Sequence, residues 1–141
     1  MEPQKQIGAL PYVETARSPL VLLITTRGTG RWTIPKGWPK LGLSSAELSA
    51  REAFEEAGVA GKVSPQPVGS YIYTKRLHLF SWTRCRVEVY VLGADRQHLS
   101  WPEKESRNLM WVEPRKAATL VKEPQLAAVL REFDRLTHSA P

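Results

Sequence analysis

Residues 37–59 read GWPKLGLSSAELSAREAFEEAGV, and this segment predicts a loop followed by one amphipathic helix. At about 100° per residue the alanines of the helix fall on a narrow stripe, which lets it lie close against a sheet. That stripe consists of Ala46, Ala50, Ala53 and Ala57. Glu52, Glu55 and Glu56 are spaced so that they gather on a patch away from the stripe. The segment therefore predicts a helix with one packing face and one acidic patch.

Both ends of this helix carry local signals. Ser44 followed by Glu47 forms a capping box, which satisfies free amide groups in the first turn. Gly58 stands where a left-handed C-terminal cap is needed. The preceding residues 34–39, IPKGWP, predict a rigid loop interrupted by a glycine.

Three carboxylates on one helical patch repel each other, and a hard divalent cation would remove that repulsion. Arg51 precedes the first of the three glutamates, and its planar fork can hold a carboxylate in orientation. The alternative is an acidic helix face that is simply solvated, and the glutamates alone favour it. The glycine loop, the spacing and the alanine stripe together favour a metal site.

A known motif has the same pattern. Gly37 followed by Arg51-Glu52-x-x-Glu55-Glu56-x-Gly58-Val59 resembles the Nudix box, G-x5-E-x7-R-E-U-x-E-E-x-G-U, in which U is aliphatic. Two positions depart from it, because Leu43 replaces the first glutamate and Ala53 the first aliphatic residue. The IPKGWP and REAFEEAGV segments look most like the branch that hydrolyses diphosphoinositol and diadenosine polyphosphates. A weaker likeness extends over residues 18–135.

The resemblance implies an α+β fold, an α/β/α sandwich with a mixed β-sheet and a loop-helix-loop motif. We expect one Nudix-like hydrolase domain over residues 1–141, with its catalytic box at residues 37–59. It also implies that Mg²⁺ or Mn²⁺ is the cofactor. The expected ligands are the Gly37 carbonyl and the carboxylates of Glu52, Glu55 and Glu56. We expect Glu52 as the general base, with Arg51 as the second catalytic residue.

Several other residues are candidates for the site. Lys36 lies beside the loop glycine, where its ammonium group could reach a bridging phosphate, and Trp38 could form a substrate wall. Arg84 and Arg86 share one strand face, which either lines the substrate groove or faces solvent. A further ligand or base could come from Glu103 or Glu105, although solvated loop acids are the simpler interpretation. Surface charge is likewise the simpler interpretation for Lys75, Arg76 and Arg107.

Bulk composition limits the partners. The net charge of +6 favours a polyanionic partner such as a nucleotide polyphosphate, a phosphorylated inositol or nucleic acid. We expect a polyphosphate small molecule, with RNA as an alternative, and neither DNA nor a membrane, since no apolar run is long enough to span one. The N-terminus shows no secretory signal pattern, and the single Cys85 fits a reducing compartment, so we expect a cytoplasmic protein.

The remaining chain predicts further strands and helices. Residues 20–26 form a continuous apolar run, which predicts a buried strand that pairs with 31–34 as a hairpin. Other strands are expected at 7–13 as a short extended segment, 68–74, 81–92 and 109–112, with a linker at 61–67, a connection at 75–80, a loop at 93–102, and helices at 114–121 and from 124. We expect Trp82 and Trp111 in the core. One face of the last helix is also expected there, and it consists of Leu126, Val129, Leu130, Phe133 and Leu136.

These observations predict a metal-dependent pyrophosphohydrolase that cleaves a phosphoanhydride, preferably in diadenosine or diphosphoinositol polyphosphates. One alternative is the same chemistry on a nucleoside triphosphate, a nucleotide sugar or an RNA 5′ end. A second alternative is a non-catalytic nucleotide- or RNA-binding module, for which Leu43 leaves room.

Overall fold

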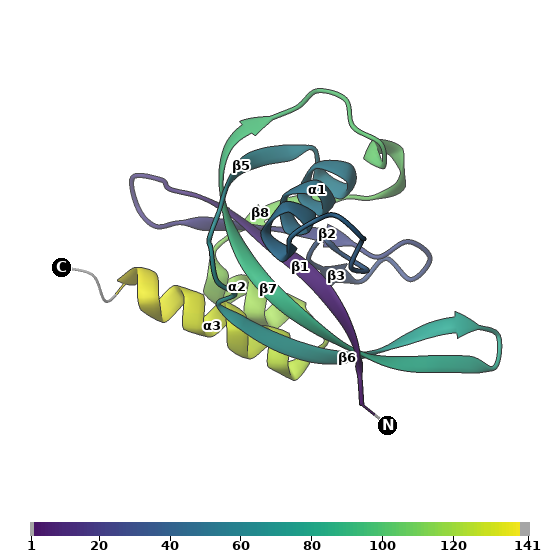
Figure 1. The fold of residues 1–141 in the computed structure, drawn as a ribbon. Coiled ribbons are helices and arrows are strands. Elements are labelled where there is room, and N and C mark those ends of the chain that lie inside the picture. Colours follow the sequence, from purple (N-terminus) through teal and green to yellow (C-terminus); the bar gives the residue numbers. More distant parts are fainter. Residues whose placement is uncertain (1, 139–141) are drawn as a thin grey trace.

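A mixed β-sheet lies between two layers of helices (Figure 1). The computed structural model describes residues 2–138. Its elements are β1 (Gln4–Val13), β2 (Leu20–Thr25), β3 (Trp32–Thr33), β4 (Lys36–Gly37), α1 (Ser45–Ala57), β5 (Val59–Val63), β6 (Gly69–His78), β7 (Ser81–Gln97), the short 3-10 helix η1 (Lys104–Ser106), β8 (Leu109–Val112), α2 (Pro114–Leu120) and α3 (Pro124–His138).

The sheet has the order β3-β2-β1-β7-β5, with β4 paired to β1, β6 to β7 and β8 to β2. β1 and β7 run parallel, and their register extends from Gln4 opposite Cys85 to Tyr12 opposite Gly93. The other pairings are antiparallel. The hairpin expected between residues 20–26 and 31–34 is confirmed as β2 and β3.

The two faces of the sheet bury different helices. On one face, Ala53 and Ala57 of α1 pack with Leu22 and Ile24 of β2. On the other face, α2 and α3 pack in the cluster that contains Leu23. Figure 1 shows α1 on one side of the sheet and α2 with α3 on the other. Because both faces of β2 are covered, its residues 21–24 are all buried, as the unbroken apolar run predicts. The α/β/α sandwich is confirmed.

Both predicted caps of α1 are present. The Ser44 side chain accepts from the Glu47 amide at 3.1 Å, and the Glu47 carboxylate accepts from the Ser44 amide at 2.9 Å. Gly58 has φ +71°, the left-handed conformation that closes the helix. On the packing side, the Ser49 hydroxyl donates to the Gly8 carbonyl at 3.1 Å, which ties α1 to β1.

Five expectations about secondary structure are wrong. β4 lies inside the predicted loop at 34–39, and β6 continues to His78 through most of the predicted connection at 75–80. β1 is a long central strand rather than a short extended segment, because it pairs with β7 along its length. β5 occupies part of the predicted linker, and β7 continues to Gln97 through the start of the predicted loop at 93–102. Gly61 and Gly93 permit this pairing, since a side chain on Gly61 would overlap the Gly93 backbone. Local composition resembles a loop there because close strand contact requires glycine.

Expectations about the core are mostly confirmed. Leu126, Val129, Leu130 and Phe133 of α3 are buried. Leu136 is 50% exposed, because it lies in the last turns of α3, beyond the sheet. Trp82 is 55% exposed, so its expected place in the core is wrong: it lies near the tip of the β6–β7 hairpin. Trp111 packs partly buried against the α1 cluster.

Candidate active site

A cavity of about 380 Å³ lies beside α1 and β4. Three acids and five cations contribute to its wall, which makes it strongly polar. The lining residues are Gln6, Thr26, Arg27, Lys36, Gly37, Trp38, Lys40, Glu52, Glu56, Tyr73, Lys75, Glu103 and Arg107. The structure thus brings Lys36, Gly37, Trp38, Glu52 and Glu56 together, as the sequence predicts.

Glu52 and Glu56 form the acidic part of this cavity. They are only 6% and 5% exposed, and they lie one helical turn apart on α1. Burial raises the pKa of Glu56 to about 9, and a hydrogen bond with Glu52 adds to that shift. Gly37 lies directly against Glu52, since a methyl group in place of its α-hydrogen would overlap the Glu52 carboxyl group. The loop glycine is therefore required by this contact.

Glu55 does not join the other two glutamates. Its carboxylate accepts from Arg51 Nε at 3.0 Å, and it does not line the cavity. Within residues 2–138, no group of three or more His, Cys, Asp or Glu side chains is placed to hold a metal ion. The expected cluster of three carboxylates is thus present as a pair, and the orienting role expected for Arg51 is exerted on Glu55.

Arg107 links the pair to a third acid. Its guanidinium group lies 3.5 Å from Glu56 and 2.9 Å from Glu103, and it donates to the Thr25 carbonyl at 2.9 Å. The Glu103 amide also donates to the Glu55 carbonyl at 3.0 Å, which holds this loop against α1. Arg107 is therefore a buried structural cation, and its expected role as surface charge is wrong. Glu103 lines the cavity, whereas Glu105 is exposed in η1.

Lys36 supplies a cation beside the acids. Its ammonium group lies 5.0 Å from the centre of the Tyr73 ring and 3.5 Å from the Thr33 hydroxyl. Loss of contact with water lowers the pKa of Lys36, and the Glu56 carboxylate opposes that shift. Tyr73 is itself held by a hydrogen bond of 2.6 Å to Gln6.

Several known proteins are similar to this chain in sequence and in fold, although no family model matches it. Nudix hydrolase 21, chloroplastic, of Arabidopsis thaliana is 30% identical over 114 residues, covering 80% of this chain and 56% of that protein. The asymmetrical bis(5'-nucleosyl)-tetraphosphatase of Sus scrofa is 27% identical over 129 residues, covering 87% of this chain and 83% of that protein. An Ap4A hydrolase of C. elegans, in a binary complex, has a TM-score of 0.70 at 19% identity, with 97% and 99% of the two chains covered.

In sequence and in fold, the chain is similar to proteins of the Nudix superfamily. Its fold is also similar to the Nudix domain of Shewanella oneidensis NrtR, which was crystallised with ADP ribose, with a TM-score of 0.68 at 15% identity over 97% of this chain and 90% of that one. The chain spans 56% to 65% of the length of five Arabidopsis Nudix hydrolases that it matches.

The two residues that depart from the Nudix box both have apolar neighbours. Leu43, which replaces a glutamate of the box, packs with Ile7, Leu48 and Tyr90 in a small apolar cluster. Leu43 is partly buried, so a charged side chain there would lose some of its contact with water beside apolar neighbours. Ala53 is fully buried against the sheet, as its place in the alanine stripe predicts.

The residues fit the divalent metal that Nudix proteins use. Two nearly buried carboxyl groups share a hydrogen bond, and the raised pKa of Glu56 means that one proton occupies the place between them near neutral pH. A cation in that place would remove the repulsion of the two carboxylates. Glu52 and Glu56 would hold it, with the Gly37 backbone adjacent.

Arg84 and Arg86 are not part of this cavity. Side chains alternate along β7, and Tyr73, which lines the cavity, lies opposite Cys85 in the β6–β7 register. The two arginines therefore point to the opposite face of the sheet, where both are exposed. Of the two alternatives, the structure supports a solvent-facing strand surface.

Sequence reasoning missed several lining residues. Gln6, Thr26, Arg27, Lys40 and Tyr73 carry no local signal, because they come from strands and loops far apart in the chain. Lys75 was expected on the surface, yet it lines the cavity two residues beyond Tyr73 on the same strand face. The alternation of side chains along a strand places Tyr73 and Lys75 on the same face of β6, but the sequence does not show which face lines the cavity.

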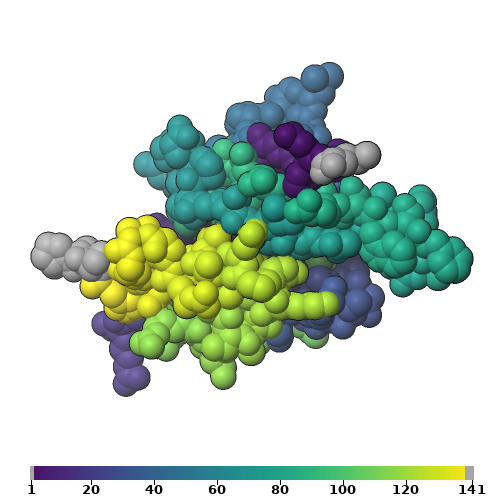
Figure 2. Space-filling model, turned by 90° about the horizontal axis from the view of Figure 1, so that it is seen from below, coloured from purple at the N-terminus to yellow at the C-terminus, as the bar shows by residue number. Residues whose placement is uncertain are grey.

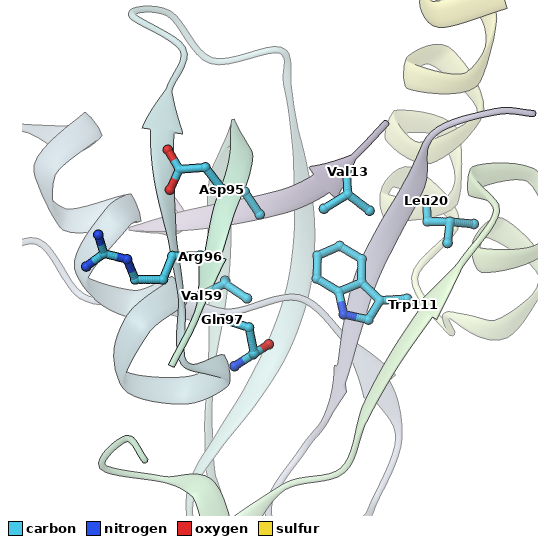
Figure 3. Close-up of a pocket in the computed structure, with 8 residues that line it drawn as sticks. Val13, Leu20, Val59, Asp95, Arg96, Gln97 and Trp111 are labelled. Carbon is cyan, nitrogen blue, oxygen red and sulfur yellow. The ribbon is translucent and has the colours of Figure 1, made fainter. Parts of the chain in front are cut away.

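A second cavity, of about 490 Å³, opens at the other end of the sheet, next to the end of α1 (Figure 3). Its wall is largely apolar: Figure 3 shows the Trp111 ring next to Val13, while Arg96 extends away from the ring. Gln97, at its rim, is fixed by hydrogen bonds to the Ala57 and Gly58 carbonyls. None of the predicted site residues lines this cavity.

Proposed function

We propose that this chain is a metal-dependent pyrophosphohydrolase that cleaves a phosphoanhydride bond in a nucleoside or inositol polyphosphate. The observation that carries the proposal is the buried Glu52–Glu56 pair beside Gly37, in a cavity that also presents five cationic side chains. Clustered acids with surrounding cations are the arrangement that phosphoryl transfer requires, because the protein mainly positions groups and neutralises charge.

Diadenosine or diphosphoinositol polyphosphates are the proposed substrates. Lys36, Lys40, Lys75 and Arg27 can face successive phosphates of a long chain, and exposed Trp38 can border the group attached to it. A tetraphosphatase is among the relatives, and an Ap4A hydrolase shares the fold, which supports the diadenosine compounds.

Each group of the site has a proposed role. Bound Mg²⁺ or Mn²⁺ would polarise a phosphoryl oxygen and acidify water. Glu52 and Glu56 would hold the cation, and Glu52 would accept a proton from the attacking water. Arg107 orients Glu56 and Glu103, and Glu103 is a second candidate for the base because it lines the same cavity. Glu55 would join the metal ligands only after leaving Arg51.

The compartment proposed is the cytoplasm, supported by a single, buried free cysteine. Several relatives are named as mitochondrial or chloroplastic proteins, so localisation of the tagged full chain is the direct test.

The function is tested with purified protein and a substrate panel, with Mg²⁺, with Mn²⁺ and with chelator. The panel contains a diadenosine polyphosphate, a diphosphoinositol polyphosphate, a nucleoside triphosphate, a nucleotide sugar and RNA with a 5′ triphosphate. We expect metal-dependent release of phosphate or nucleotide from one of the first two. Preference for another member would change the substrate while keeping the chemistry.

Glu56→Gln is the decisive variant. It should lower kcat by about a thousandfold or more while the fold is retained, because the amide cannot replace a carboxylate ligand. Glu132→Gln, on the exposed face of α3, is the matched control and should leave kcat unchanged. Unchanged turnover in Glu56→Gln would count against this site. Tight RNA binding by the wild type without any hydrolysis would favour the non-catalytic module.

A further inference from the structure

The β6–β7 hairpin projects beyond the rest of the sheet. Pairing of β1 with β7 begins at Cys85, so hairpin residues 74–84 stand as a ribbon of two strands. Figures 1 and 2 show this teal ribbon standing clear of the helices. A two-stranded ribbon in water is marginally stable by itself. The side chains that it exposes therefore call for an explanation.

Large apolar side chains cover its tip. Leu79 is 64% exposed and Phe80 85% exposed at the turn, and Leu77 and Trp82 flank them, also exposed. The turn is held in shape, since Arg76 donates to the His78 carbonyl at 3.2 Å and to the Leu79 carbonyl at 3.1 Å. The apolar side chains are therefore presented to solvent by an ordered turn. Large exposed apolar side chains gathered at one turn in this way mark an interaction site.

Cations lie directly behind the apolar tip. Arg76 and Trp82 are paired across the ribbon, as are Thr74 and Arg84, and Arg86 follows on the same strand face. No aspartate or glutamate occurs in the sequence between Glu56 and Glu88. Neither Arg84 nor Arg86 forms an ion pair with any residue in the range 2–138. The partner of this surface must therefore offer both apolar volume and negative charge.

We propose that the hairpin tip, residues 76–86, docks the protein on the surface of a bilayer that contains acidic phospholipids. Leu79 and Phe80 would insert among the acyl chains, and Trp82 would lie at the level of the headgroups. The arginines would contact lipid phosphates and carboxylates. The order from tip to base, apolar and then cationic, matches the order from acyl chain to headgroup.

Two other occupants fit less well. A second copy of the chain would bring two acid-free, cationic ribbons together, and like charges across an interface disfavour contact. Single-stranded nucleic acid would contact the arginines through its phosphates and stack a base on Trp82, but it has no apolar surface to cover the leucines.

The sequence led us to expect no membrane partner because it lacks a spanning segment. No helix among the described residues has the length and apolarity needed to cross a bilayer. Docking on one leaflet requires only the tip and its cations. The proposal does not depend on the hydrolase activity, because Lys75 is the only residue of the stretch 75–86 that lines the cavity.

Sedimentation with vesicles tests the proposal on the full chain. We expect binding to vesicles of equal phosphatidylserine and phosphatidylcholine, much weaker binding to phosphatidylcholine alone, and weaker binding as salt rises. The double variant Leu79→Ser/Phe80→Ser should lower the partition coefficient by about tenfold or more. Arg84→Gln should lower it by about fivefold. Leu99→Ser is the matched control: Leu99 is 87% exposed but lies past the end of β7 opposite to the hairpin tip, and binding should be unchanged.

Tryptophan emission gives a second readout. Acidic vesicles should shift the emission of the wild type to shorter wavelength, and Trp82→Phe should abolish most of that shift while hydrolysis of soluble substrate is retained. The melting temperature of the double variant should equal that of the wild type, because both substituted side chains are exposed.

Three results would overturn the proposal. The first is wild-type protein that fails to sediment with acidic vesicles, or a double variant that sediments equally well. The second is RNA binding without vesicle binding, lost in Arg84→Gln but retained in the double variant, which would assign the surface to nucleic acid. The third is a dimer that Leu79→Ser/Phe80→Ser dissociates, without vesicle binding. A protein that binds vesicles but hydrolyses nothing would reject the proposed function alone.

Discussion

Gly37 and Glu52 lie so close together that residue 37 has no room for a side chain. Gly37 lies in β4, which pairs with β1, so its backbone cannot move away from α1 without breaking that pairing. A methyl group on Gly37 would occupy the space of the Glu52 carboxyl group. The glycine of the box is thus explained by volume rather than by a left-handed backbone, since its φ is not positive.

Gly37→Ala should therefore displace the Glu52 carboxylate. We expect kcat/KM to fall by about a hundredfold, because shifts of a catalytic group by about 1 Å have effects of that size. Gly69→Ala is the control, since its added methyl would meet the Val129 side chain, 3.1 Å from Cγ2, and neither residue lines the cavity. Equal activity in the two variants would show that Glu52 does not need its present position.

The buried carboxyl of Glu56 makes stability depend on pH. Its pKa is about 9 in the folded protein and close to 4.5 in the unfolded chain, so the folded state binds the additional proton between these values. The stabilising contribution is fully present below about 4.5 and is lost as pH rises through 9. Metal-free protein should therefore lose stability over this window, and Glu56→Gln should flatten the loss. Chelator-treated samples melted across pH provide the measurement.

Added metal should reverse that trend. Because the cation must displace the shared proton, the rise in melting temperature caused by Mn²⁺ should grow with pH towards 9. A metal-induced rise that is the same at pH 6 and pH 8.5 would contradict the assignment of Glu56 as a ligand.

At the scale of one element, α1 is stabilised mainly at its ends and on one face. The capping box closes the N-terminus, and Gly58 closes the C-terminus beneath the ring of Trp101, which a side chain on Gly58 would overlap. Between these ends, small residues let the helix approach the sheet, and Ser49 bonds to the Gly8 carbonyl. Glu52 and Glu56 can remain on the cavity because none of these contacts involves their side chains.

Ser44→Ala should remove one half of the capping box. We expect a loss of about 1 kcal/mol in the free energy of unfolding and a melting temperature lower by about 3 °C. Ser45→Ala, one position later and inside the helix, should change stability by less than about 0.5 kcal/mol. Urea denaturation of both variants measures the difference, and equal losses would argue against the cap.

At the scale of the whole molecule, Arg107 joins parts that are distant in the chain. It contacts the Thr25 carbonyl in β2, Glu56 in α1 and Glu103 in the loop before η1. Its side chain is only 11% exposed, so these contacts are largely shielded from water. One guanidinium group therefore sets the position of the loop that carries Glu103 relative to the helix that carries Glu56.

Arg107→Ala should cost about 3 kcal/mol in the free energy of unfolding, because it leaves the buried Glu56 and the partly exposed Glu103 without their partner. It should also lower kcat, since Glu103 and Glu56 lose their common anchor. Arg135→Ala removes an ion pair with Glu132 that is exposed on α3, and it should cost less than about 1 kcal/mol. Similar losses in both variants, measured by urea denaturation, would contradict the anchoring role.

The sequence alone was sufficient for everything in α1 that depends on near neighbours: its ends, the alanine stripe, the carboxylate spacing and the likeness to the Nudix box. These features follow from helical geometry and from hydrogen bonds between residues a few positions apart. The hairpin of β2 and β3, the strand β8 and the two C-terminal helices were predictable for the same reason.

Only the tertiary structure decided what meets at the cavity. Lys75, Tyr73, Gln6 and Arg107 reach it through pairings of distant segments, and the same pairings turn Arg84 and Arg86 to the opposite face. The central place of β1 likewise depends on its parallel contact with β7. A strand presents alternate side chains to two faces, and only the identity of its neighbours determines which face becomes a site.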